Sequence, residues 1–240
     1  MWSIAKKEFS QFFSSLTGII AITAFLLLNG LMLFVFPDSN ILDFGYGTLD
    51  QFFELAPWLL LLVIPAITMR SFSEEFSGGT FELLKTRPLT HQQIVLGKYL
   101  GCFAVVVIAL LPTVVYAISV QSLSAIGGID RGATAGSYVG LLFLGAVFTA
   151  VGLWCSSFTY NAVIAFIVSA FACFIIYSGF NAISRIPALG AGADYYIEML
   201  GIDFHYRSIS RGVIDSRDLV YFLSIISIFL FFTNRQLIRR

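Results

Sequence analysis

The side chains that could catalyse a reaction or bind a metal ion are few in this sequence, and they are widely separated. The two histidines, His91 and His205, stand in predicted loops, far apart along the chain. The three cysteines lie inside apolar runs and lack Cys-x-x-Cys spacing: Cys102, Cys155 and Cys173. We interpret them as small apolar core residues. The sequence has no HExxH segment, nucleophile-elbow serine or paired carboxylates in an apolar run, so it does not indicate an enzyme.

A phosphate-binding loop is also missing from the sequence. Gly97-Lys98 is the only Gly-Lys pair, and it lacks both the upstream glycine and the following hydroxyl of the GxxxxGK[ST] motif. We therefore expect a non-catalytic chain that binds no cofactor itself. If the protein performs ATP-driven work, ATP and Mg²⁺ must be bound by a partner chain.

The composition indicates the environment in which the chain folds. Its 240 residues are 58% hydrophobic and only 12% charged, against roughly 25% charged in soluble domains. Because a span needs roughly 20 apolar residues, these residues allow six spans and modest loops but no separate soluble catalytic domain. The 14 basic and 14 acidic residues balance, which argues against a nucleic-acid partner. We expect an all-α integral membrane protein, with residues 1–240 forming one transmembrane domain surrounded by lipid.

Six apolar segments are predicted to span the membrane, at about 17–36, 55–69, 97–120, 136–155, 162–181 and 219–233. With Lys98 counted as a cytoplasmic residue, these spans contain no ionisable side chain, which disfavours an ion-driven carrier. Three prolines within the spans are expected to start or kink helices: Pro57, Pro65 and Pro112.

Residues 1–16 are predicted to form an amphipathic helix. Their apolar side chains recur at helical spacing: Trp2, Ala5, Phe9, Phe12, Phe13 and Leu16. The helix is expected to lie in the membrane interface. Packing against protein on the cytoplasmic side is the alternative.

The charge distribution predicts the orientation. With the N-terminus inside, cytoplasmic segments hold nine basic and four acidic residues, and outer segments hold five basic and ten acidic residues. Positive charge thus stays inside, which predicts that both termini lie in the cytoplasm. The outer segment 182–218 mixes aromatic and charged residues. It is expected to form short interfacial helices, a re-entrant element or an ordinary structured loop. The Gly- and Ser-rich segment 122–136 is predicted to be a flexible outer loop.

The cytoplasmic loop at 70–98 has the most specific pattern. Gly78 and Gly79 are expected to break the chain, and Thr80 to cap a short helix that Pro88 ends. Thr90 and Gln93 have the spacing of a capping box that would start the third span, three residues apart.

The charges of the short helix match its dipole, with Glu82 in the first turn and Lys85 and Arg87 near the end. Such a bounded, amphipathic helix is typical of a docking element. Phe81, Leu83 and Leu84 would fill a groove on a partner. An ordinary capped connector is the alternative.

This loop resembles the signature of ABC-2-type transporter permeases. That signature has a run of Glu, a Gly-Thr-Leu-Glu-type turn, Leu-Leu, Pro and Val-Leu-Gly-Lys. The matching residues are Glu74, Glu75, Gly79, Thr80, Glu82, Leu83, Leu84, Pro88, Val95, Leu96, Gly97 and Lys98. Phe81 departs from the Leu that is common in the family. The N-terminal helix, six spans and outer loop fit the same architecture, so the resemblance covers the chain.

A second stretch, residues 211–224, is similar to the permeases of bacterial gliding-motility ABC systems. It is also similar to the related permeases of nitrous-oxide-reductase maturation. The gliding type is the nearer match. The residues of this outer motif are Arg211, Gly212, Asp215 and Asp218. From the residues alone, Asp215 or Ser216 is expected to cap the sixth span.

The resemblance implies a permease subunit paired with a second permease, identical or related, above two copies of a separate ATPase. The residues that would couple to the ATPase are Glu74, Glu75, Gly78, Gly79, Thr80, Phe81, Glu82, Leu83, Leu84, Lys85 and Arg87. Substrate export and a purely mechanical role both need this loop, so they stay open at this point. An ion-coupled carrier that acts alone is the third alternative.

Small residues recur in the fourth span at Gly140, Gly145, Ala146 and Gly152. They allow another helix to approach closely. The sequence does not say whether that helix belongs to the same subunit.

Overall fold

The computed structural model describes residues 1–36, 41, 48–86, 88–124, 128–185, 193–212 and 215–239. Within these ranges, every regular element is a helix. Six helical segments are long and apolar enough to cross a membrane: Leu16–Phe34, Asp50–Ser77, His91–Leu123, Arg131–Ser156, Ala162–Ser184 and Ser216–Ile238. The predicted all-α fold class with six spans is confirmed.

Four of the spans are single helices: α2 (Leu16–Phe34), α3 (Asp50–Ser77), α7 (Arg131–Ser156) and α12 (Ser216–Ile238). The third span is α5 (His91–Leu110), a 3₁₀ turn (Leu111–Thr113) and α6 (Val114–Leu123). Pro112 lies in that turn, where its missing N–H removes a helical hydrogen bond. The fifth span is α8 (Ala162–Phe174), a π-helical turn (Ile175–Gly179) and α9 (Phe180–Ser184).

Several helices are longer than their apolar segments. The helix α3 runs from Asp50 to Ser77, whereas hydropathy indicated only residues 55–69. Helix α5 begins at His91 and not at Gly97. Polar residues continue these helices beyond the apolar runs, and hydropathy does not detect such extensions.

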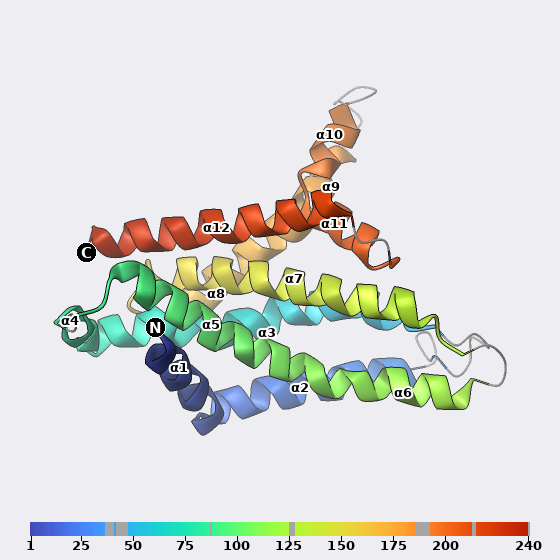
Figure 1. The fold of residues 1–240 in the computed structure, drawn as a ribbon, viewed down its shortest axis with the longest axis horizontal. Coiled ribbons are helices and arrows are strands. Elements are labelled where there is room, and N and C mark those ends of the chain that lie inside the picture. Colours follow the sequence, from blue (N-terminus) through green and yellow to red (C-terminus); the bar gives the residue numbers. More distant parts are fainter. Residues whose placement is uncertain are drawn as a thin grey trace.

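Four shorter helices complete the chain: α1 (Trp2–Ser14), α4 (Thr80–Lys85), α10 (Ala193–Met199) and α11 (Ile202–Ile209). Figure 1 places both chain ends and α4 together at one end of the bundle, which we call the α4 end. Helix α11 and the first turns of α3, α7 and α12 lie at the opposite end, which we call the α11 end. An even number of spans returns the chain to the side on which it started.

The segment 182–218, which was predicted to lie outside, contains the end of α9, α10, α11 and the first residues of α12. The predicted flexible loop 122–136 is wrong in its extent, because α6 continues to Leu123 and α7 begins at Arg131. Asp130 caps α7 by accepting hydrogen bonds from the backbone N–H groups of Gly132 (2.9 Å) and Ala133 (3.1 Å).

The centre of the bundle is formed by α3 and α7, whose apolar parts are 61% and 78% buried, whereas the spans that contain α2, α8 and α12 are only 22% buried. Glycines on α7 allow the close packing. A Cβ at Gly140 would lie 3.0 Å from Ile209, one at Gly145 would lie 2.9 Å from Val106, and one at Gly152 would collide with Thr68. The small-residue face of the fourth span is therefore covered within the chain.

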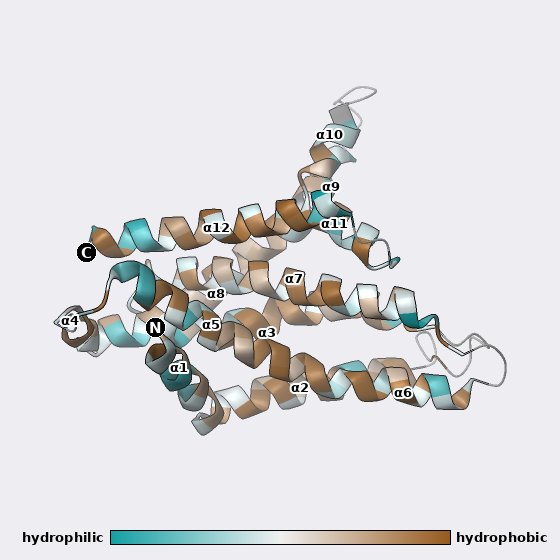
Figure 2. Cartoon of the chain, in the orientation of Figure 1, coloured by the Kyte–Doolittle hydropathy of each residue, from teal (hydrophilic) through white to brown (hydrophobic). Residues whose placement is uncertain are grey.

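Apolar side chains cover the outside of the bundle. Figure 2 shows hydrophobic residues along the spanning helices and hydrophilic residues near both ends. Leu27 on α2, Phe171 on α8 and Phe231 on α12 are 55%, 64% and 55% exposed, respectively. Such a surface is stable against lipid and not against water, so the chain is a multi-pass membrane protein.

Candidate functional site

Helix α4 is a six-residue helix between α3 and α5. Gly79 precedes it with φ of 66°, a left-handed conformation that glycine adopts without steric cost. The chain therefore turns sharply after α3 at Gly78 and Gly79. The expectation that Thr80 caps the helix is wrong. Thr80 is its first residue, and the Thr80 hydroxyl donates to the Glu75 carbonyl at 3.5 Å.

The side chains of α4 divide between the protein interior and the surface. Phe81 is buried at 5% exposure and packs edge-to-face on Phe76, with ring centroids 5.0 Å apart. Leu83 is 67% exposed, and Glu82 is exposed beside it. Phe81 therefore fixes α4 to α3, and Leu83 is the apolar side chain that α4 presents outward.

Leu84 lies between these extremes, being partly buried against the core. Arg87 and the side chain of Lys85 fall outside the described residues. The predicted role of these two positively charged residues near the end of α4 thus stays a prediction.

The start of α5 is fixed by the predicted capping box, which is confirmed. The Gln93 N–H donates to the Thr90 hydroxyl oxygen at 3.3 Å, and the Thr90 N–H donates to the Gln93 side chain at 3.2 Å. Because two backbone N–H groups are satisfied at once, α5 has a defined first turn.

Helix α1 lies directly against α5 at the α4 end. Ile4 and Ala5 are buried in this contact. A Cβ at Gly97 would lie 2.9 Å from Ile4, and one at Gly101 would lie 2.8 Å from the Glu8 side chain. One face of α1 thus packs on protein, which was the alternative to a purely interfacial helix. Trp2 stays 76% exposed, as a side chain in the membrane interface would be.

This close packing brings Glu8 of α1 to the wholly buried side chain of Lys98 on α5. The Lys98 ammonium lies 2.6 Å from Glu8 Oε1 and 2.9 Å from Glu75 Oε2. It also donates to the Ser71 carbonyl at 2.6 Å. The Ser71 hydroxyl donates to the second Glu8 oxygen at 3.1 Å. Lys98 therefore joins α1, α3 and α5 by charge-assisted hydrogen bonds.

The expectation that the spans carry no ionisable side chain is wrong for Lys98. The residue was counted with the cytoplasmic loop 70–98. The Thr90–Gln93 capping box already predicted a helix from this point, and α5 does begin at His91, two turns before Lys98. Its partners, Glu8 and Glu75, are remote in sequence. The one sequence feature that could have predicted this ion pair was a lone lysine beside an apolar run, because such a lysine needs a buried partner of opposite charge.

The two predicted coupling carboxylates have different surroundings. Glu75 is 7% exposed; it accepts a hydrogen bond from Lys7 at 2.8 Å and forms an ion pair with Lys98. Glu74 is partly exposed and pairs with Arg70 at 3.1 Å. In this structure Glu75 faces inward, so it connects the turn before α4 to α1 and α5 and does not itself form an outward surface.

At the α11 end, the structure distributes the four motif residues among different roles. Arg211 is exposed, and Gly212 packs on Ala133 with φ of 82°. The predicted cap is confirmed at Asp215, whose side chain accepts from the Arg217 N–H at 2.9 Å. Asp218 is buried, at 5% exposure.

Asp218 pairs with His205, which sequence reasoning placed in a loop and the structure places inside α11. The Asp218 carboxylate lies 2.6 Å from His205 Nδ1, and the Met199 carbonyl lies 2.9 Å from His205 Nε2. Tyr221 stacks on the imidazole at 3.8 Å between ring centroids. This arrangement fixes α11 and the end of α10 to the first turns of α12.

In the part of the chain that the structure describes, no three His, Cys, Asp or Glu side chains gather as metal ligands would. The arrangement at the α4 end is instead a structural one. It consists of a short surface helix and an ion-paired base that connects three helices.

Comparison with known proteins agrees with this architecture. No curated protein matches the sequence. The family model described as "ABC-2 family transporter protein" matches residues 2–229. The chain therefore belongs to the ABC-2 family and is a membrane permease of an ABC transporter.

Proposed function

We propose that this permease binds a separate ATPase through α4 and transmits the ATPase's motion to the membrane-spanning helices. The observation that carries the proposal is the combination of an exposed apolar side chain, Leu83, with a rigidly held base beneath it. Leu83, at 67% exposure, is the apolar side chain that α4 offers to a partner. Glu82 beside it supplies the charge that sets the register of docking.

The route of transmission follows from the contacts. A push on α4 acts on α3 through Phe81 and the turn at Gly79, and on α1 and α5 through Glu75 and Lys98. Pulling Lys98 away from Glu75 would break an ion pair in which the Lys98 side chain is wholly buried, which is costly. The three helices therefore move together.

In this proposal the chain supplies no catalytic group and binds no cofactor. ATP and Mg²⁺ are bound by the partner ATPase, of which two copies dock beneath two permeases, identical or related. The α4 end faces the cytoplasm of a bacterial inner membrane, together with both termini. Basic residues at this end support that orientation: Lys6, Lys7, Arg70 and Arg235.

The resemblance of residues 211–224 supports a role in a gliding-motility ABC complex, where the permease would drive or anchor extracytoplasmic machinery. Substrate export is the other outcome that the family allows. A complex that hydrolyses ATP with no transported species would favour the mechanical role.

The docking assignment can be tested by placing a photoreactive benzoylphenylalanine at position 83, in place of Leu83, in native membranes. We expect a cross-link to a chain that contains an ABC ATPase. The same group at position 28, in place of the exposed Leu28 of α2, serves as the control and should give no ATPase adduct. Equal adducts at both positions, or none at position 83, would contradict docking at α4.

A further inference from the structure

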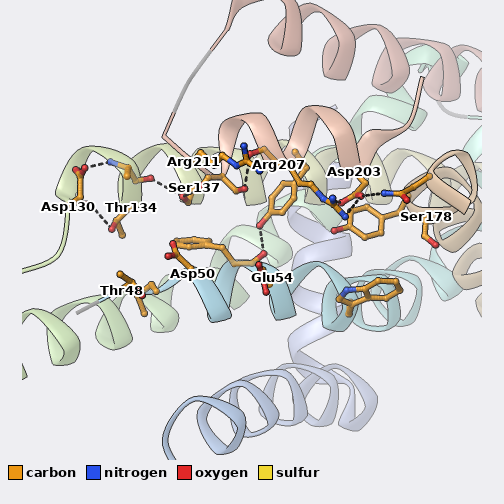
Figure 3. Close-up of a pocket in the computed structure, with 18 of the residues that line it drawn as sticks. Thr48, Asp50, Glu54, Asp130, Thr134, Ser137, Ser178, Asp203, Arg207 and Arg211 are labelled. Carbon is orange, nitrogen blue, oxygen red and sulfur yellow. Dashed lines mark hydrogen bonds and ion pairs between the residues drawn. The ribbon is translucent and has the colours of Figure 1, made fainter. Parts of the chain in front are cut away.

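A cleft of about 1060 Å³ opens at the α11 end, where the starts of α3 and α7 meet α9 and α11 (Figure 3). Its two long walls carry opposite charges. Asp50 and Glu54 come from α3 on one side, and Arg207 and Arg211 come from the α11 side (Figure 3). Arg185 completes the lining beyond α9.

One of the arginines is already neutralised. Arg207 binds Asp203 through two nitrogens, at 2.8 and 3.1 Å, and Asn181 donates to the same carboxylate at 2.9 Å. Tyr206 fixes this wall to α3, because its hydroxyl donates to the Phe53 carbonyl at 2.7 Å. Burial raises the pKa of Tyr206 well above its usual value, so this donor keeps its proton.

The remaining charges have no such partner. Among the described residues that line the cleft, five charged side chains take part in no ion pair: Asp50, Glu54, Asp130, Arg185 and Arg211. The cleft therefore presents three carboxylates and two guanidinium groups on a framework that is itself fixed. One of the carboxylates, Asp130, also caps α7. A ligand with both a positive and a negative group complements this lining.

The cleft continues into the membrane as an apolar surface. Asp50, Glu54 and Trp58 follow one another at four-residue steps on one face of α3. Trp58 is 46% exposed and packs against Tyr177 and Phe174, with ring centroids 5.5 and 6.3 Å away. Further along the spans, Leu62 is 53% exposed.

We propose that this cleft binds a zwitterionic phospholipid with an ethanolamine headgroup. The phosphate accepts hydrogen bonds from Arg211 and Arg185, and the ammonium group donates to Glu54 and Asp50. The acyl chains lie along Trp58 and the exposed apolar residues beyond it. An anionic lipid would leave the carboxylates uncompensated, and a soluble zwitterion would leave the apolar surface uncovered.

The test is native mass spectrometry of the full-length chain in mild detergent. Phosphatidylethanolamine and phosphatidylglycerol with identical acyl chains are added at equal concentration. We expect phosphatidylethanolamine adducts to exceed phosphatidylglycerol adducts by about tenfold. This ratio corresponds to the free energy of one hydrogen bond to a charged group. Glu54→Gln and Arg211→Gln should each abolish this preference. Arg217→Gln, an exposed arginine outside the cleft, should leave it unchanged.

Other results would overturn the proposal. They include equal binding of both lipids, a preference for phosphatidylglycerol, or a preference that both cleft variants retain. Glycerophosphoethanolamine that competes as well as the intact lipid would indicate a site for a soluble zwitterion. A stable dimer that excludes lipid and dissociates in the Glu54→Gln variant would show that a second copy of the chain covers the cleft.

Trp58 forms the apolar part of the cleft, so Trp58→Ala should weaken lipid binding without reversing the headgroup preference. These experiments need no ATPase, so their outcome is independent of docking at α4.

Discussion

Lys98 is the residue at which three helices meet, and its environment determines what a substitution there will cost. Its ammonium group is wholly buried between Glu8 and Glu75. Replacing a buried ion pair by apolar groups is often neutral, but removing one partner alone leaves an uncompensated buried charge. The stability of this cluster therefore depends on its members being present together.

We expect Lys98→Met to destabilise the folded chain by about 3–5 kcal/mol, because two buried carboxylates lose their shared partner. Arg70→Met is the control. It breaks the ion pair between Arg70 and Glu74, whose side chains are 39% and 41% exposed, respectively. Because this pair is exposed to solvent, its loss should cost at most about 1 kcal/mol. Denaturant unfolding in detergent micelles measures both. The triple variant Lys98→Met with Glu8→Gln and Glu75→Gln should recover most of the loss. Equal effects of Lys98→Met and Arg70→Met would contradict the role of the network.

Local side-chain roles were predictable where their partners lie within one turn. The Thr90–Gln93 capping box and the Asp215 cap are examples, since each bonds to backbone a few residues away. The pairs Lys98–Glu8 and His205–Asp218 were not predictable, because tertiary packing sets them. The cleft likewise needs residues from five separate elements: α3, α7, the π-helical turn, α9 and α11.

At the scale of elements, glycines decide how closely α1 approaches α5. A Cβ at Gly101 would lie 2.8 Å from both the Ala5 carbonyl oxygen and the Glu8 side chain. Since the Ala5 atom belongs to the backbone, it cannot turn aside, and the whole helix must shift. The contact between Glu8 and Lys98 depends on this approach.

We expect Gly101→Ala to destabilise the chain by about 1–3 kcal/mol through overpacking and displacement of α1. Gly30→Ala is the matched control. Its Cβ would meet only the Tyr116 hydroxyl at 3.5 Å, so it should be neutral or slightly stabilising through helix propensity. Thermal unfolding of the two variants distinguishes these outcomes. A neutral Gly101→Ala would show that α1 does not need this close contact.

The short helix α4 carries a second prediction at this scale. Leu83→Asp should weaken ATPase binding about tenfold or more, because burying a leucine at an interface contributes roughly 1.5–3 kcal/mol. Gln92→Asp, an exposed residue in the first turn of α5, should bind normally. Titration of the ATPase against each purified permease gives the affinities. Unchanged binding by Leu83→Asp would place the docking surface elsewhere.

The existence and order of the long helices followed from hydropathy, but their ends did not. Polar residues such as Glu74 and Glu75 extend α3 past its apolar run because they find ionic partners there. The short helix α4 followed from the glycine pair and Pro88, although its first residue was misplaced by one position.

At the scale of the whole molecule, the chain ends and α4 share one end of the bundle (Figure 1). Charge counts support our proposal that this end faces the cytoplasm. The three native cysteines are buried, at 4%, 2% and 0% exposure, so introduced cysteines can be labelled against a low background.

In intact cells, a membrane-impermeant maleimide should label Ser216→Cys at the α11 end. Gln92→Cys, at the opposite end, should react only after the cells are opened. Both positions are exposed, so a difference in labelling reports the side of the membrane. The reverse pattern would invert the proposed orientation and remove α4 from the cytoplasm.

The central claim, that this permease works through a separate ATPase docked at α4, is tested most directly by affinity purification from native membranes in mild detergent. We predict recovery of a P-loop ATPase with measurable ATP hydrolysis, and loss of that chain from Leu83→Asp and from charge reversal at Glu82. Recovery of the permease alone, active in liposomes under an ion gradient, would contradict the account and indicate a carrier that acts by itself.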